Sequence, residues 1–233
     1  MSRKFSLGYL VDQARKRSDM EHQDLVSKEE WYSYASEVYA ELFEKVVLGE
    51  PQRKRVEVTI PTDGSDTYDL PENFLTALGV DFIPTSGIRR KLYRLQVQER
   101  NRFEAVRGSS EARAFEFIND QIKLHPAPPA GQEYVLVYVP HATRLESQGP
   151  GFEIDVVAPS GEKFMIWGMA ALALAKEESF DHATYAQQQA DRAQAAIEEW
   201  ASEQLISEAN RRVVNSSELD YDDDPAFYYR GGY

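Results

Sequence analysis

Histidine is the side chain of this sequence best suited to acid–base catalysis, because its charge changes near neutral pH. The chain contains four of them: His22, His125, His141 and His182. None forms the HxxxH or HExxH spacing that places two metal ligands on one face of a helix. We therefore predict ordinary loop or surface histidines, and a chain with no catalytic residue, no metal site and no cofactor.

Pairs of acidic residues are the second source of chemistry. Glu177–Glu178 and Glu198–Glu199 are neighbours on predicted helices, where consecutive side chains point about 100° apart, so neither pair forms a carboxylate dyad. Asp222–Asp224 lacks the spacing of an EF-hand loop. The absence of cysteine excludes disulfides, thiolate zinc sites and cysteine nucleophiles. A hydrolytic enzyme remains an alternative, and it would need a pocket with a close carboxylate pair.

Charge is distributed unevenly along the chain. With 26 Lys+Arg and 39 Asp+Glu the net charge is −13, which opposes general binding to nucleic-acid phosphates. Residues 84–113 nonetheless carry eight cations and three acids, whereas residues 177–224 carry three cations and thirteen acids. Head-to-tail packing of subunits could place these regions against each other; DNA contact and a solvated face are the alternatives. The candidate contacts to a neighbouring subunit or another protein partner are Arg89, Arg90, Lys91 and Arg94.

Residues 215–233 combine an acidic run with aromatic residues and have neither a helical nor a strand period. Exposed aromatic and arginine side chains of this kind anchor protein interfaces, so we interpret the segment as an extended tail that binds a partner. Folding back onto its own domain is the alternative. The candidate anchors are Leu219, Tyr221, Pro225, Phe227, Tyr228, Tyr229, Arg230 and Tyr233.

Helical patterns occupy both ends of the sequence. An amphipathic helix is predicted over Phe5–Arg17. A second begins at a capping box, Ser27 and Glu30, and ends before Gly49 and Pro51. Helix returns at Ser160, and Asp181 is the predicted N-cap of a last helix that runs to about Val213. The stripe of that last helix is predicted at Tyr185, Gln189, Ala193, Ile197, Trp200 and either Gln204 or Leu205.

The middle of the sequence, residues 53–140, is predicted to be mainly β. Strands are expected at residues 56–61, 67–71, 79–83 and 133–139, with a hairpin at 114–124 that turns at Asn119-Asp120. Residues 92–106 are predicted to form a helix that opens with a strand-like Leu92-Tyr93.

Together these patterns predict an α+β fold. Helices from residues 1–52 and 160–214 form a bundle, an antiparallel β domain of residues 53–140 is inserted between them, residues 141–159 are an irregular linker, and residues 215–233 are the extended tail. No apolar signal segment is visible, and the most apolar run, Phe164–Ala175, is too short to cross a bilayer. We expect synthesis in the cytoplasm and no membrane contact.

The sequence resembles the head-to-tail adaptor (connector, or head-completion) proteins of tailed bacteriophages. The resemblance rests on the opening helix, the Glu29-Glu30-Trp31 helix, Tyr68–Phe74 (similar to the family's Tyr-x-Leu-Pro-x-Asp-Phe), Ile122–Pro128 and Tyr134–Pro140. Their order along the chain is more specific than any one of them. Asn73 stands where the family commonly has Asp, which leaves its turn chemistry intact.

This resemblance implies a structural protein of the virion neck and not an enzyme. Such adaptors assemble as a ring, usually a dodecamer, on the portal protein, continue the DNA channel without specific DNA binding, and present a surface to tail or nozzle proteins. Their C-terminal extension commonly reaches along the portal, which implies portal contact for Leu219–Tyr233. Another neck or tail component, such as a tail terminator or a nozzle protein, is the alternative.

Overall fold

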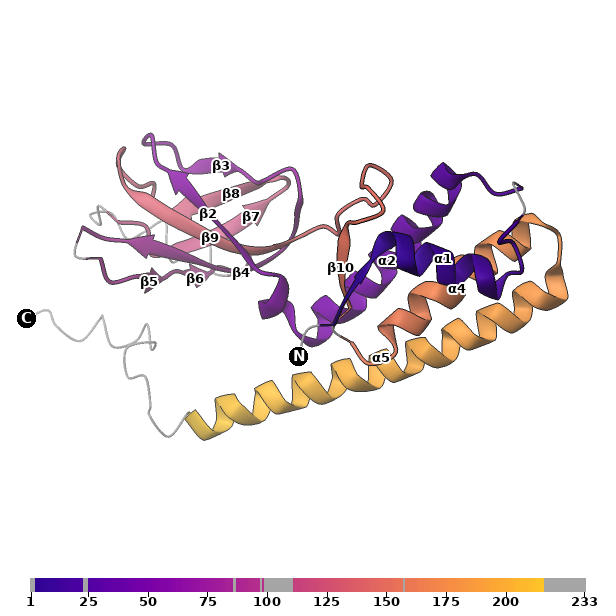
Figure 1. Cartoon of the computed structure of the whole chain (residues 1–233). Helices are drawn as coiled ribbons and strands as arrows, with labels where there is room; N and C mark the ends of the chain where they lie inside the picture. Colours follow the sequence, from indigo (N-terminus) through magenta and orange to yellow (C-terminus); the bar gives the residue numbers. More distant parts are fainter. Residues whose placement is uncertain are drawn as a thin grey trace, which may run out of the picture. The chain divides into compact units, whose positions relative to one another are not determined.

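The structure, a computed structural model, describes residues 3–22, 25–85, 87–96, 98, 111–156 and 158–215, with side chains up to residue 205. The chain divides into two compact units, a helical unit of Met1–Glu50 with Leu145–Tyr233 and a β unit of Pro51–Arg144 (Figure 1). The predicted α+β fold, with helices from both chain ends and an inserted antiparallel β region, is confirmed. The predicted tail lies outside the described residues from residue 216 onward.

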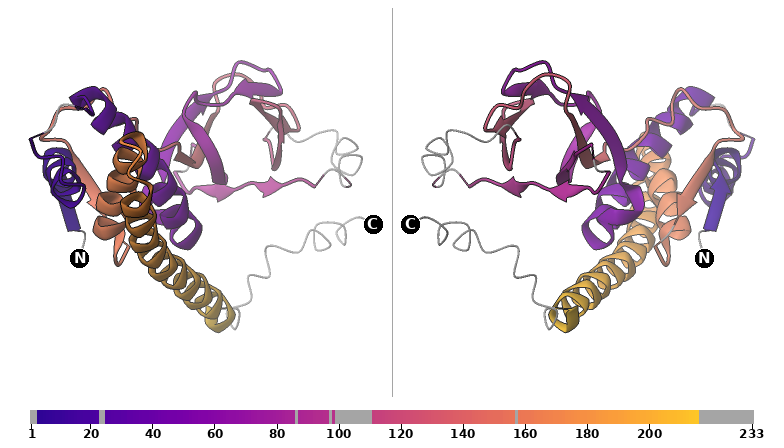
Figure 2. Two further views of the ribbon diagram at one scale, coloured as in Figure 1. Left: turned by 90° about the vertical axis from the view of Figure 1, so that its right-hand side faces the viewer. Right: turned by 90° about the vertical axis from the view of Figure 1, so that its left-hand side faces the viewer.

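The helical unit contains four α-helices, α1 (Leu7–Arg17), α2 (Lys28–Gly49), α4 (Gly161–Lys176) and α5 (Phe180–Asn215), within the described part of the chain. The longest of them, α5, lies along α4 and also contacts α2, while α4 contacts α1 and α2 (Figure 2). Residues from the two chain ends therefore share one apolar core.

The start of α2 has the predicted capping box. The Ser27 Oγ accepts a hydrogen bond from the Glu30 backbone N–H at 3.2 Å, and the Glu30 carboxylate accepts one from the Ser27 N–H at 2.8 Å. Val26 and Trp31 are both buried, as a hydrophobic staple requires. These local interactions fix where α2 begins.

Small residues bring α2, α4 and α5 close together. A Cβ added at Gly49 would lie 2.7 Å from the Cα of Ala201, and one added at Gly168 would lie 2.8 Å from Val38 Cγ1. The buried face of α5 is correspondingly rich in alanine: Ala186, Ala190, Ala193, Ile197 and Ala201.

Two predictions for α5 were wrong. Tyr185 and Leu205 lie outside the buried stripe and are 56% and 48% exposed, because the face of α5 that packs against the other helices is the one that carries the alanines. Asp181 is not the N-cap: the helix begins at Phe180, and the N–H of Ala183 donates to the Ser179 carbonyl at 2.9 Å. Asp181 lies in the first turn, where its charge still favours the helix dipole.

A two-stranded sheet joins the N-terminus to the predicted irregular linker. Strand β1 (Arg3–Ser6) pairs antiparallel with β10 (Glu153–Val156), so the first helix begins at Leu7 and not at Phe5, and residues 141–159 contain a strand. Ser6 caps α1, since its Oγ accepts from the Tyr9 N–H at 3.2 Å. The buried Ile154 and Val156 hold β10 against the helices.

The β unit begins with a short 3₁₀ helix, η1 (Pro51–Lys54), and contains two four-stranded sheets. One has the order β2 (Val56–Pro61), β9 (Glu133–Pro140), β4 (Phe74–Ile83), β5 (Arg90–Lys91). The other has the order β3 (Thr67–Asp69), β8 (Gln121–His125), β7 (Ala114–Ile118), β6 (Tyr93–Arg94). Pairing is antiparallel except between β6 and β7 among these described strands. The side chains between the sheets form the core of this unit.

The Pro-Glu-Asn-Phe turn before β4 is fixed by side-chain contacts. The Asn73 Oδ1 accepts a hydrogen bond from the Tyr138 hydroxyl at 3.0 Å, and its backbone carbonyl accepts from the His141 N–H at 2.7 Å. The Phe74 ring lies 5.6 Å from that of Phe117 and 5.8 Å from that of Tyr138. The predicted hairpin is present as β7 and β8. Of the predicted 92–106 helix, Tyr93 and Arg94 form β6, and residues 99–106 lie outside the described residues.

Candidate interaction surfaces

The histidines do not assemble a reactive centre. His22, His141 and His182 are exposed, whereas His125, predicted to be a loop or surface residue, is buried because β8 extends to it. Its Nε2 lies 3.0 Å from an oxygen of the buried Glu116 on the neighbouring strand β7. No three metal-ligating side chains gather anywhere in the described parts of the chain. The Glu116–His125 pair is an internal contact of the hairpin, with neither side chain open to a substrate.

The four basic candidates lie together where the chain passes from one sheet to the other. Leu92 is buried between β5 and β6, and its N–H donates to the Val80 carbonyl at 2.8 Å, while the Tyr93 N–H donates to the Arg113 carbonyl at 2.9 Å. These backbone bonds hold the flanking residues on the surface. We call the resulting surface the basic edge: Ile88, Arg89, Arg90, Lys91, Tyr93 and Arg94.

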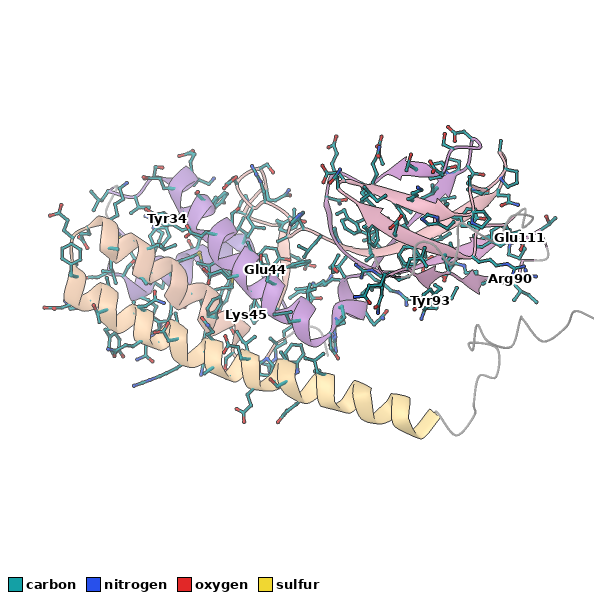
Figure 3. The ribbon with its side chains drawn as sticks, turned by 180° about the vertical axis from the view of Figure 1, so that it is seen from behind. Tyr34, Glu44, Lys45, Arg90, Tyr93 and Glu111 are labelled. Atoms are coloured by element: carbon teal, nitrogen blue, oxygen red, sulfur yellow. The ribbon has the colours of Figure 1, made fainter. Side chains whose placement is uncertain are left out.

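Three of these cations are held in position by neighbours. The Arg89 Nη1 lies 2.9 Å from a Glu57 oxygen, and the Arg90 Nη1 lies 3.1 Å from a Glu111 oxygen. The Arg94 guanidinium lies 5.2 Å from the centroid of the Phe117 ring. All of these cations are exposed to solvent (Arg90, Tyr93 and Glu111 are labelled in Figure 3). Exposed ion pairs contribute little to stability, so the basic edge is oriented and still available to a partner.

Large apolar side chains accompany the cations of the basic edge. Ile88 is 72% exposed and Tyr93 is 48% exposed. Arginine and tyrosine are the residue types enriched at the energetic centres of protein interfaces. The composition of the basic edge is therefore that of a protein-binding surface.

An acidic surface on α2 was not among the sequence predictions. Glu37, Glu41 and Glu44 are exposed and lie four and three residues apart, so they follow one line along the helix, and Leu48 continues that line. We call this the acidic ridge: Glu37, Glu41, Glu44 and Leu48. The signal was available in the sequence, since acids at helical spacing lie opposite the buried stripe of the same helix.

Two lysines of the helical unit, one on α2 and one on α4, pair with glutamates outside the acidic ridge. The Lys45 Nζ lies 3.4 Å from a Glu198 oxygen on α5. Lys176 on α4 pairs with Glu30, and this hydrogen bond lowers the pKa of the Glu30 carboxyl. Burial, together with the carboxylates of Glu30 and Glu37, raises the pKa of the Tyr34 hydroxyl (Tyr34, Glu44 and Lys45 are labelled in Figure 3).

A smaller aromatic cluster lies elsewhere on the helical unit. The Trp167 ring on α4 packs edge-on against the Tyr185 ring on α5, with centroids 5.9 Å apart. The guanidinium of Arg17, at the end of α1, lies 5.3 Å from the centroid of the Trp167 ring. This cluster ties three helices together, and the exposed Tyr185 gives it an accessible side.

The predicted tail anchors, Leu219 through Tyr233, lie outside the described residues, as do three cations of the predicted basic region, Arg100, Arg102 and Arg107. No helix in the described parts of the chain is both apolar and long enough to cross a bilayer.

The chain matches the model of a known protein family. A family model described as SU10 adaptor protein matches residues 10–217, a range that takes in both the helical unit and the β unit. The search of curated proteins found no match.

Proposed function

The chain belongs to the SU10 adaptor protein family, a family of structural phage proteins and not of enzymes, and we propose that it forms the ring that joins the portal to the tail. As a phage adaptor it is a component of the virion. The proposal adds its place in the neck, its assembly as a dodecamer, and its docking on the portal protein.

The observation that carries this proposal is the extent of the family match. The match runs from within α1 to residue 217, so it covers both the helical unit and the β unit and is not confined to one of them. The exposed surfaces support it, because each unit carries charged and apolar side chains in patches suited to binding another protein.

Each candidate surface has a proposed partner. The C-terminal segment Leu219–Tyr233 binds the portal through its aromatic residues and Arg230. The basic edge contacts a neighbouring subunit or a tail or nozzle protein. DNA passes through the ring without specific binding, which agrees with the net charge of −13 because phosphates are repelled by an acidic surface.

Binding of the purified full-length chain to the portal of the same phage tests this assignment. The mixture is separated by gradient sedimentation and imaged by electron microscopy, with the purified tail protein as the alternative target. The proposal predicts a ring on the portal. Binding to the tail protein alone would identify a tail terminator or nozzle component instead, and binding to neither would reject a neck function.

A further inference from the structure

The acidic ridge and the basic edge have opposite charge and lie on different units of the same chain. We propose that they bind each other between neighbouring copies, so that the acidic ridge on α2 of one subunit receives the basic edge of the next. This interface rests on the proposed ring and names the surfaces that build it.

Charge complementarity is the first argument. The acidic ridge holds three carboxylates, and Lys45, the residue that follows Glu44 in the sequence, pairs with Glu198 on α5. Like charges at these helical spacings repel one another and destabilise a helix. A facing set of cations would offset the repulsion between the three carboxylates. The basic edge lies within residues 84–113, where eight cations and three acids give a net charge of +5.

Apolar side chains provide the second argument. Leu48 is 69% exposed at the end of the acidic ridge, and the basic edge exposes Ile88 and Tyr93. Protein interfaces combine a buried apolar centre with a charged rim. Because Leu48 lies at one end of the ridge, its contact with either Ile88 or Tyr93 would supply an apolar contact at that end of the interface, with the carboxylates and cations along the rest.

The two surfaces also match in length. From Glu37 to Leu48 the helix rises about 17 Å, at about 1.5 Å per residue. The extended chain from Arg89 to Arg94 spans about 17 Å, at about 3.3 Å per residue. The two surfaces are therefore of similar length, and the three carboxylates, which span about 10 Å along the helix, fit within the length of the edge.

The pairing of two different surfaces has a consequence for symmetry. Each copy offers its acidic ridge to one neighbour and its basic edge to the other, which is a head-to-tail contact. Such a contact closes into a ring when the rotation between neighbours divides a full turn, whereas a self-complementary surface gives only a dimer. The inferred interface is thus of the type that a ring requires.

Cysteine cross-linking tests this pairing directly, because the natural chain has no cysteine. Glu41→Cys and Lys91→Cys are introduced into separate chains, which are mixed on purified portal and oxidised. A covalent heterodimer is expected from the mixture and none from either variant alone. Cysteine at Gln187, an exposed position on α5 outside both surfaces, is the matched control and is expected to give no cross-link with Lys91→Cys.

One chain that carries both cysteines distinguishes contact between copies from contact within a copy. A ladder of covalent multimers is expected. Two results would overturn the interface: a disulfide within one copy without multimers, or no cross-link at all although the chain has bound the portal. Neither result would contradict the adaptor function. Failure of the natural chain to bind portal would reject the function, and the interface with it.

Charge reversal provides a second, independent measurement. Glu37→Lys with Glu44→Lys, and separately Arg90→Glu with Lys91→Glu, are each expected to lose ring formation, while a chain that carries all four changes regains it. Glu199→Lys with Glu203→Lys on α5 makes the same change in net charge away from the acidic ridge and is expected to leave the ring intact. Undiminished assembly of either reversed variant would contradict the pairing.

Discussion

The acidic ridge leads to a prediction in which stability and assembly change in opposite directions. Replacing Glu37 and Glu44 by lysine leaves Glu41 between two cations. Both neighbouring pairs change from repulsive to attractive, and each such interaction contributes about 0.2–0.5 kcal/mol. The helical unit should therefore be stabilised by roughly 1 kcal/mol, which raises its melting temperature by about 3 °C.

Tryptophan fluorescence measures this effect selectively, because Trp31, Trp167 and Trp200 all belong to the helical unit. Urea unfolding should show a higher midpoint with an unchanged slope. Replacement of the same two residues by glutamine removes the repulsion without adding attraction, so it should give about half the gain. Glu199→Lys with Glu203→Lys should give almost none, since this pair stays like-charged.

The same lysine variant should fail to form the ring on the portal despite its higher stability. Loss of function in a more stable protein would show that the ridge serves binding and not folding. An unchanged or lower midpoint would mean that the three carboxylates do not repel one another. Normal assembly would refute the role of the ridge.

Three further predictions concern the tail, the helix packing and one ion pair. Deletion of Leu219–Tyr233 should leave the far-ultraviolet circular dichroism of a folded protein and abolish sedimentation with the portal; retained binding would remove the tail assignment. Gly49→Ala should lower stability by about 1–3 kcal/mol in urea unfolding, because its Cβ would overlap the backbone of Ala201; an unchanged midpoint would contradict the close contact of α2 and α5. Lys176→Met should raise the pKa of the Glu30 carboxyl, measured by NMR titration. Because the pKa of Glu30 is lowered in the folded protein, its pair with Lys176 stabilises the fold at pH values above the ordinary carboxyl pKa. This contribution disappears as the pH falls through the lowered pKa. An unchanged titration of Glu30 in the variant would show that Lys176 is not its partner.

Elements with a local signal could be predicted from the sequence. The capping box at Ser27 fixes the start of α2 through bonds within four residues, and the hairpin around Asn119-Asp120 joins two strong strand patterns. The residues that line the buried face of α1, which are Leu7, Leu10, Val11 and Ala14, follow directly from their spacing.

Elements that depend on partners distant in the sequence could not be predicted from it. Strand β1 exists because Glu153–Val156 lies beside it, and nothing within Arg3–Ser6 specifies that partner. The buried face of α5 was misassigned because a large aromatic residue such as Tyr185 is expected to be buried. The helices packed against α5 instead cover its alanines.

The candidate surfaces also differ in how far the sequence alone could predict them. The basic edge was found from the density of cations in the sequence, and the structure adds what the sequence could not, namely that Leu92 turns inward and leaves its neighbours exposed. The acidic ridge was missed because acids on the outer face of a helix resemble ordinary solubilising residues. The structure adds that Lys45, which adjoins the ridge in sequence, pairs instead with Glu198, a residue distant in sequence.

The most direct test of the central claim is an electron cryomicroscopy reconstruction of the phage neck, with this subunit located in the density. The account predicts a closed ring on the portal in which α2 of each copy faces the basic edge of its neighbour. A virion with this chain located away from the portal, or in single copies that do not touch one another, would contradict it.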